Sequence, residues 1–203
     1  MTKITVGIVD YGVGNHASVR NTLYDLGYRC RVTGESAVLN ACDILLLPGV
    51  GAFRPAMQAL QSRSLDHYLI EQTKRDRPLL GICLGMQLLA QASHENGITS
   101  GLGLIPGEVV ALGPPRWHIG WNALKLVQAD PLFKNSDRQV FYFNHAYAFQ
   151  APKDYQVCRT TSGDEFVSAV RHRRVVGVQF HPEKSQAAGH QLLRRLVDGL
   201  CNA

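Results

Sequence analysis

Strand-like runs of apolar residues alternate with segments of helical length over the first half of the chain. Helical spacing covers residues 15–26 and residues 55–74, and the second segment is broken near Arg63. This alternation is typical of a parallel sheet whose strands are joined by crossover helices, so the sequence predicts an α/β fold. The expected strands are residues 4–9, 29–33, 44–47 and 79–82.

The pattern changes from about Leu104 onward, where Pro and Gly become frequent and apolar residues recur at every second position. We expect a closing helix over residues 186–200, preceded by added, partly antiparallel strands. These strands are expected at residues 139–143, 166–170 and 175–180. Residues 1–203 are predicted to form one domain, with a central, mostly parallel sheet flanked by helices.

The composition is that of a globular protein, since 45% of the 203 residues are hydrophobic and 18% are charged. The longest apolar runs are shorter than the roughly 20 residues that a membrane-spanning helix needs. The N-terminal segment lacks the apolar region of a secretion signal. We therefore expect a cytoplasmic protein with no membrane partner.

The net charge of +5 comes from scattered Lys and Arg residues, which is weak evidence for nucleic-acid binding. The one dense basic run, Arg171–Arg174, lies between two expected strands and predicts an exposed hairpin turn. The 5 cysteines include no Cys-x-x-Cys or Cys/His pair at metal-ligand spacing. No nucleic-acid partner, metal or other cofactor is expected.

The segment Gly81–Gly85 joins an expected strand to a helix that carries Leu84, Leu88 and Ala92 at helical spacing. Its Gly-x-Cys-x-Gly pattern is the thiol form of the nucleophile elbow, in which the central residue lies on a sharp turn. Free N–H groups at the start of the helix favour a thiolate at Cys83. Alone, the motif fits a buried structural cysteine equally well.

A second segment favours the nucleophile, because the strand expected at residues 175–180 leads into His181-Pro182-Glu183. Residues two apart in an extended stretch point the same way, and the proline excludes a helix. The imidazole of His181 and the carboxylate of Glu183 are therefore expected on one side. With Cys83 they predict a nucleophile, a general base and an orienting acid for acyl transfer.

Acyl transfer also needs donors for a developing oxyanion. We expect one from the backbone N–H of Leu84, and another from Val50 or Gly51 in the loop of residues 48–53. Gly49 and Gly51 would let a peptide of this loop turn toward or away from a ligand, although a plain tight turn also explains them.

Residues 12–17 match the Gly-x-Gly-x-x-Gly/Ala pattern of dinucleotide sites, with Glu35 at the spacing of a ribose-binding acid. Such turns are common between strands and helices. A nucleotide site would also leave Cys83, His181 and Glu183 unexplained, so we regard the match as a turn.

Taken jointly, the motifs resemble those of the class I, or triad, glutamine amidotransferases over nearly the whole chain. Within that family they are most similar to the glutaminase subunits of imidazole glycerol phosphate synthases. The resemblance implies a flavodoxin-like fold and hydrolysis of the side-chain amide of glutamine. It is carried by the loop after the third expected strand, the elbow around Cys83 and the strand leading to Glu183. The marks of the narrower group are Val9–Asn15, Pro48–Gly51, His118–Asn122 and Glu183–Ser185.

The resemblance implies that Cys83 forms a glutamyl thioester, that His181 transfers protons and that Glu183 orients His181. Gln87 and Glu95 are expected on the helix after Cys83. Family members carry His-Ser-Tyr where this chain has Ala146 between its His and Tyr, so binding there relies on backbone groups or is weaker. The residues implied to bind glutamine are Gly51, Leu84, Gln87, Glu95, His145 and Tyr147.

A partner is implied as well, because free ammonia in water becomes protonated and loses its nucleophilicity. The resemblance points to a (β/α)8-barrel cyclase subunit, which turns a phosphoribulosyl-formimino-carboxamide nucleotide into imidazole glycerol phosphate and aminoimidazole carboxamide nucleotide. Family members are slow until this partner holds its ligand, and reorientation of Pro48–Gly51 is the expected route of activation. The expected docking residues are Asn15, Trp121, Tyr142 and Lys184.

Three alternatives stay open at this point. The chain could supply ammonia to a different synthase, for example in surface-sugar biosynthesis. It could be a non-catalytic scaffold subunit, although the presence of Cys83, His181 and Glu183 argues against this. A cysteine peptidase on the same type of fold is the third alternative.

Overall fold

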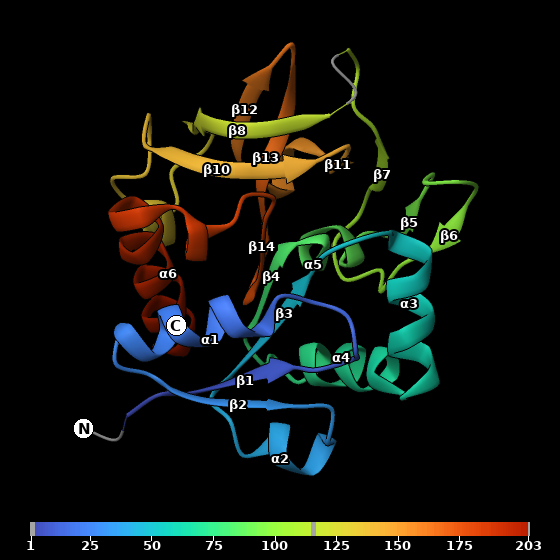
Figure 1. The fold of residues 1–203 in the computed structure, drawn as a ribbon, viewed down its shortest axis with the longest axis vertical. Helices are drawn as coiled ribbons and strands as arrows, with labels where there is room; N and C mark the ends of the chain where they lie inside the picture. The colour runs from blue at the N-terminus through green and yellow to red at the C-terminus, as the bar shows by residue number, and fades with distance from the viewer. Residues whose placement is uncertain (1–2, 115–116, 203) are drawn as a thin grey trace.

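The computed structural model of the chain describes residues 3–114 and 117–202. Within these ranges the central sheet has the strand order β2-β1-β3-β4-β14-β13-β12-β9 (Figure 1). The part from β2 to β14 is parallel, and the pairs beyond β14 are antiparallel. The bounds are β1 (Thr5–Val9), β2 (Arg29–Thr33), β3 (Ile44–Gly49), β4 (Leu79–Cys83), β9 (Lys125–Leu126), β12 (Gln156–Ser162), β13 (Asp164–His172) and β14 (Val175–Val178). The predicted α/β class, with antiparallel strands added in the second half, is confirmed.

Helices cover both faces of the parallel part of the sheet, which is why its strands are apolar throughout. Leu45 and Leu47 pack into a core shared with α3 and α4, whereas Ile44 and Leu46 pack into a core shared with α1 and α6. All of these leucine and isoleucine side chains are fully buried. The helices are α1 (His16–Asp25), α2 (Ser36–Asn40), α3 (Phe53–Ser62), α4 (Leu65–Lys74), α5 (Leu84–Leu88) and α6 (Gln186–Cys201).

Two smaller sheets lie beside the central one, above the carboxyl ends of its parallel strands in the view of Figure 1. One is an antiparallel ribbon of β8 (His118–Ala123) and β10 (Val140–His145). The other has the order β11-β7-β5-β6. Its strands are β5 (Ala92–Ser93), β6 (Thr99–Ser100), β7 (Glu108–Ala111) and β11 (Tyr147–Gln150), and short 3-10 turns lie at Pro131–Phe133, Lys153–Tyr155 and Pro182–Lys184.

Two local predictions, the break near Arg63 and the basic hairpin, can be compared with the structure. The expected break near Arg63 separates α3 from α4. The basic run forms the predicted hairpin, because His172 pairs with Val175 and leaves Arg173 and Arg174 as the turn, but only Arg173 is exposed. Arg173 has the positive φ of 53° that such turns require. No helix among residues 3–114 and 117–202 has the length and apolarity to cross a membrane.

The helix expected after Cys83 is shorter than predicted, since α5 ends at Leu88 and Ala92 belongs to strand β5. Every residue of α5 is buried, so the apolar spacing reflected burial on all sides rather than a long amphipathic helix. The carbonyl of Leu88 accepts from the N–H of Leu102, and that of Leu89 from Leu104. These long-range bonds take the place of a further helical turn.

Candidate active site

Cys83 lies at the junction of β4 and α5, at the carboxyl edge of the parallel sheet. Its φ is 56° and its ψ is −113°, a strained conformation for a residue with a side chain. A Cβ on Gly81 would lie 2.7 Å from the carbonyl oxygen of Gly85, and one on Gly85 would overlap the carbonyl oxygen of Leu47. The two glycines therefore permit the close strand-to-helix approach that defines the elbow.

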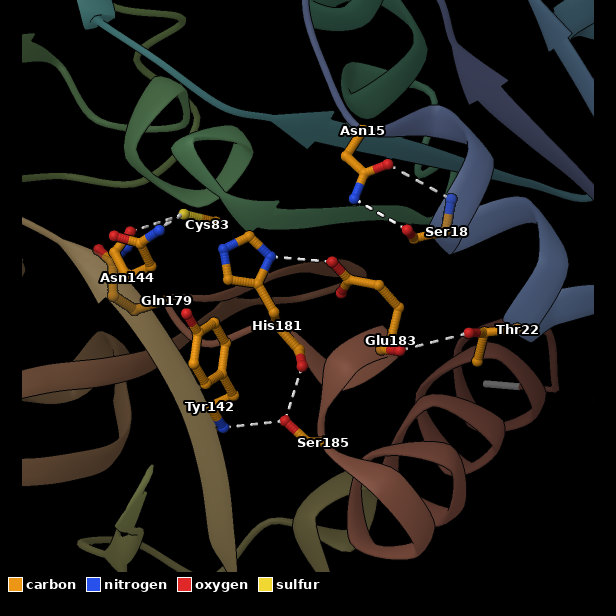
Figure 2. Close-up of polar contacts among 10 residues, drawn as sticks. All are labelled: Asn15, Ser18, Thr22, Cys83, Tyr142, Asn144, Gln179, His181, Glu183 and Ser185. Carbon is orange, nitrogen blue, oxygen red and sulfur yellow. Dashed lines mark hydrogen bonds and ion pairs between the residues drawn. The ribbon is translucent and has the colours of Figure 1, made fainter. Parts of the chain in front are cut away.

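His181 and Glu183 follow the neighbouring strand β14 at the same edge of the sheet (Figure 2). The imidazole Nδ1 of His181 lies 2.9 Å from Oε1 of Glu183, and both side chains are buried. The backbone of His181 is hydrogen-bonded at both its N–H and its carbonyl. Its N–H donates to the carbonyl of Tyr142 at 2.9 Å, and its carbonyl accepts from the hydroxyl of Ser185 at 2.6 Å.

The charge state of His181 follows from its neighbours. Burial lowers its pKa, but side-chain hydrogen bonds with Cys83 and Glu183, and the negative charges of both, outweigh burial and raise it to about 10. The imidazole is therefore protonated at neutral pH. With Nδ1 facing Glu183, its other ring nitrogen is left for the sulfur, so the structure brings the predicted nucleophile, base and acid together.

A pocket of about 300 Å³ opens over the sulfur. It holds all the residues expected to bind glutamine or to form the oxyanion hole, and Glu183 lies behind His181 outside its lining. Trp117 and Asn144 line the pocket although the sequence did not single them out for it, and Lys184, expected only on the docking face, lines it as well. The lining is Val50, Gly51, Cys83, Leu84, Gln87, Glu95, Trp117, Asn144, His145, Ala146, Tyr147, His181 and Lys184.

Glu95 reaches the pocket by a route that differs from the prediction. It lies beyond β5 rather than on the helix after Cys83, because α5 ends seven residues earlier, at Leu88. Its Oε2 accepts a hydrogen bond of 2.8 Å from the backbone N–H of Phe53, at the start of α3. This bond fixes the carboxylate at the rim of the pocket.

The loop after β3 divides into a fixed and an open part. Gly49 lies opposite Cys83 in the sheet, and a Cβ there would be 2.8 Å from the backbone nitrogen of Gly85. Tyr11 holds the same region, since its buried hydroxyl donates to the carbonyl of Pro48 at 2.8 Å. Gly51 has a φ of 92° with open space where a Cβ would be. Freedom to reorient is therefore expected at Gly51, not at both glycines.

A chain of buried side chains supports the pocket wall. Nδ1 of His145 lies 2.8 Å from the carbonyl oxygen of Tyr147, and its Nε2 lies 3.1 Å from Nδ1 of His118. Nε2 of His118 in turn lies 2.7 Å from the amide nitrogen of Asn122. Burial, together with the charges of His118 and His181, lowers the pKa of His145 to about 4 against a weaker opposing bond to Tyr147. His145 is therefore neutral near pH 7, and burial lowers the pKa of His118 as well.

The chain matches the family model described as glutamine amidotransferase class-I over residues 7–198. The chain belongs to this family. It is 44% identical over 196 residues to imidazole glycerol phosphate synthase subunit HisH of Carboxydothermus hydrogenoformans, covering 95% of this chain and 98% of that protein. It is also 42% identical to imidazole glycerol phosphate synthase hisHF, chloroplastic, of Arabidopsis thaliana, covering 95% of this chain and 34% of that longer protein.

Solved structures agree with the amidotransferase fold. A glutamine amidotransferase from Thermotoga maritima superposes with a TM-score of 0.74 at 17% identity, covering 100% of both chains. PurLQS from the same organism gives a TM-score of 0.78 at 18% identity, covering 98% of this chain and 100% of that one. At these identities the likeness shows the fold alone.

In this amidotransferase, the expected docking residues mostly gather beside the pocket. The rings of Trp121 and Tyr142 are 5.8 Å apart, and Nζ of Lys184 lies 5.8 Å from the centroid of the Tyr142 ring. Trp121 is 46% exposed, and Ile119 on the same strand is 61% exposed. Asn15 has a local role too, since its side chain caps α1 by accepting from the N–H of Ser18.

Gln179 is a site residue that the sequence analysis missed. Its buried amide nitrogen lies 3.8 Å from Sγ of Cys83. The signal was available, because Gln179 precedes His181 by two positions in an extended segment and so shares its side. The same spacing of two residues, counted forward from His181, predicted the position of Glu183.

Proposed function

We propose that this amidotransferase is the glutaminase subunit of an imidazole glycerol phosphate synthase, acting as one domain over residues 1–203. The observation that carries the proposal is the buried Nδ1–Oε1 contact of 2.9 Å between His181 and Glu183, with Cys83 on the other side of the imidazole. Relatives at 44% identity over nearly their full length support the specific synthase. A free thiol nucleophile also fits a reducing, cytoplasmic setting.

Glutamine is proposed to enter with its α-amino-acid end toward Gln87 and Glu95. The carboxylate of Glu95 is held by Phe53 and supplies the negative charge that an α-ammonium group needs. The backbone of residues 145–147 would receive the α-carboxylate, since Ala146 has no hydroxyl to offer. This orientation places the side-chain amide beside Cys83 at the base of the pocket.

The proposed reaction proceeds in two displacements. The sulfur attacks the amide carbon, and the backbone N–H of Leu84, with that of Val50 or Gly51, stabilises the oxyanion. His181 gives its proton to the departing nitrogen, which leaves as ammonia, and a glutamyl thioester remains. Water then adds to the thioester while His181 accepts a proton, the carbon–sulfur bond breaks, and glutamate and the free Cys83 result.

Ammonia is proposed to pass to a cyclase subunit that docks on the face formed by Ile119, Trp121, Tyr142 and Lys184, with Asn15 beside it. The exposed aromatic and aliphatic side chains of this face support the assignment. The Arabidopsis relative, in which a segment similar to this chain is part of a longer synthase, supports it too.

The decisive experiment mixes the purified chain with glutamine, the cyclase subunit and the phosphoribulosyl-formimino-carboxamide nucleotide. We expect glutamate and imidazole glycerol phosphate in equal amounts. Glutamate release with transfer of ammonia only to another synthase would identify a paralogous amidotransferase. Peptide cleavage without glutamine hydrolysis would favour a peptidase, and no turnover with any partner would favour a scaffold.

Activation by the partner is proposed to act through the open part of the loop, at Gly51. Turning the Val50–Gly51 peptide would complete the oxyanion hole. Glutaminase turnover should therefore rise when the cyclase holds its nucleotide. Equal turnover with and without the liganded cyclase would contradict this switch.

A further inference from the structure

The sulfur of Cys83 has two polar neighbours besides His181 (Figure 2). The carbonyl oxygen of Asn144 lies 3.9 Å away, and the amide nitrogen of Gln179 lies 3.8 Å away. A backbone carbonyl only accepts hydrogen bonds, so that of Asn144 can bond to Cys83 only while the thiol is protonated. An N–H donor can serve the ionised sulfur, and this is the state that attacks an amide carbon.

The direction of the Gln179 amide is fixed by a chain of contacts that ends at the backbone. The carbonyl of Tyr147 accepts at 2.9 Å from Nε2 of Gln87. The same nitrogen donates at 3.0 Å to Oε1 of Gln179. Because the backbone carbonyl cannot donate, Gln87 must present its nitrogen, and Gln179 must present its oxygen to that nitrogen. The nitrogen of Gln179 is thereby turned toward the sulfur.

Burial stabilises this arrangement of the two amide groups. Gln179 is 0% exposed and Gln87 is 5% exposed, so water does not compete for their amide groups. The backbone N–H of Gln179 donates to the carbonyl of Ser168 at 2.9 Å, which ties its main chain to strand β13. An N–H held in a dry site before the reaction begins stabilises negative charge without reorganisation.

We propose that Gln179 is a catalytic residue of the glutaminase reaction, donating an N–H hydrogen bond to the ionised sulfur of Cys83 both before attack and when the thioester breaks. This role rests on the proposed function for its place in turnover. Gln87 is then the positioning residue that turns the Gln179 amide toward the sulfur, in addition to its proposed contact with glutamine.

The test measures alkylation of Cys83 by iodoacetamide as a function of pH, which requires no glutamine. In Gln179→Met, a variant of similar size without an N–H donor, the pH of half-maximal alkylation should rise by about one unit, as expected for loss of one hydrogen bond to a charged group. Glutamine turnover in the complex with cyclase should fall about tenfold. An unshifted profile in a folded Gln179→Met protein would overturn the proposal.

A second variant keeps the test decisive if Gln179→Met does not fold. Gln87→Met frees the Gln179 amide to rotate, so it should shift the alkylation profile in the same direction by a smaller amount. An unshifted profile in Gln87→Met would contradict the orienting chain. The alkylation profile of the double variant should shift no further than that of Gln179→Met alone, because both substitutions act through the same donor, the amide N–H of Gln179.

Gln156→Met is the matched control, since Gln156 is a buried glutamine that bonds to the carbonyl of Ala151 and to Arg159 outside the lining of the pocket. Its alkylation profile should match that of the unaltered chain, and an equal shift there would overturn the assignment to Gln179. A shifted Gln179→Met profile in a chain that releases no glutamate would instead overturn the proposed function and support the hydrogen bond.

Discussion

At the scale of single residues, the pocket depends on buried groups whose charge states are set by their neighbours. His181 is held protonated by Cys83 and Glu183, whereas His145, only a short distance away, is held neutral by burial. His118 has its pKa lowered by burial as well. The first imidazole can supply a proton to departing ammonia, and the second can keep its hydrogen bond to the Tyr147 carbonyl.

Stability should therefore decline in mild acid. The pKa of His145 is about 4 in the folded protein and 6.5 in an unfolded chain, so the unfolded state binds more protons between these values. The free energy of unfolding should fall by up to about 1.4 kcal/mol per pH unit as pH drops from 6.5 toward 4. Urea unfolding at several pH values measures this. A His145→Gln variant should show a shallower dependence, and an unchanged slope would contradict the assignment.

Ala146 offers a residue-scale test of glutamine binding. It lines the pocket, at the position where the sequence resemblance implies a serine in family members. Restoring the hydroxyl in Ala146→Ser should lower the KM for glutamine about three- to tenfold, as one added hydrogen bond would, with little change in kcat. Steady-state kinetics in the complex with cyclase measures both values. A KM that stays constant or rises would show that the backbone alone binds this end of the substrate.

At the scale of elements, the sequence pattern predicted those helices, strands and turns whose bounds depend on residues close by in the chain. The parallel strands, the break at Arg63 and the turn at Arg173 could be placed because their signals lie within a few residues. The end of α5 and the strands β5 and β6 could not, because they depend on backbone bonds to residues 101–105 and on pairing with β7. Glu95 was accordingly assigned to the pocket but to the wrong element.

The glycines of the loop after β3 should differ in their tolerance of a methyl group. Gly49→Ala would push β3 away from α5, because its Cβ would lie 2.8 Å from both Gly85 and Leu84. We expect a loss of more than about 2 kcal/mol in unfolding free energy and most of the glutaminase activity. Gly51→Ala meets open space and should lose only about 1 kcal/mol from its positive φ. Equal losses in urea unfolding would refute this division.

At the scale of the whole molecule, the ribbon of β8 and β10 contributes both to the exposed docking face and to the wall of the pocket. Ile119 and Trp121 face outward from β8, while His118 on the same strand anchors the wall of the pocket through His145. In the view of Figure 1 this ribbon lies at the top of the molecule, whereas the edge strand β2 of the central sheet lies near the bottom. A partner that docks on the outer face thus bears on an element that also shapes the glutamine site.

Docking should be sensitive to charge at the exposed apolar positions of β8. Ile119→Asp should weaken binding of the cyclase subunit at least tenfold, because it buries an unpaired carboxylate in the interface. Val32→Asp is the matched control, since Val32 is 37% exposed on β2, an edge strand of the central sheet that does not pair with the ribbon. Isothermal titration with the cyclase compares the two. Equal weakening by both variants would contradict the assigned face.

The central claim is that Cys83 attacks the side-chain amide of glutamine, and covalent labelling tests it most directly. The chain, in complex with the cyclase, would be treated with a glutamine analogue that carries an electrophilic carbon in place of the amide, and the label mapped by mass spectrometry. We predict labelling of Cys83 alone among the 5 cysteines, slowed by glutamine and abolished in His181→Ala. Absence of label on Cys83, or labelling that glutamine does not slow, would contradict the account.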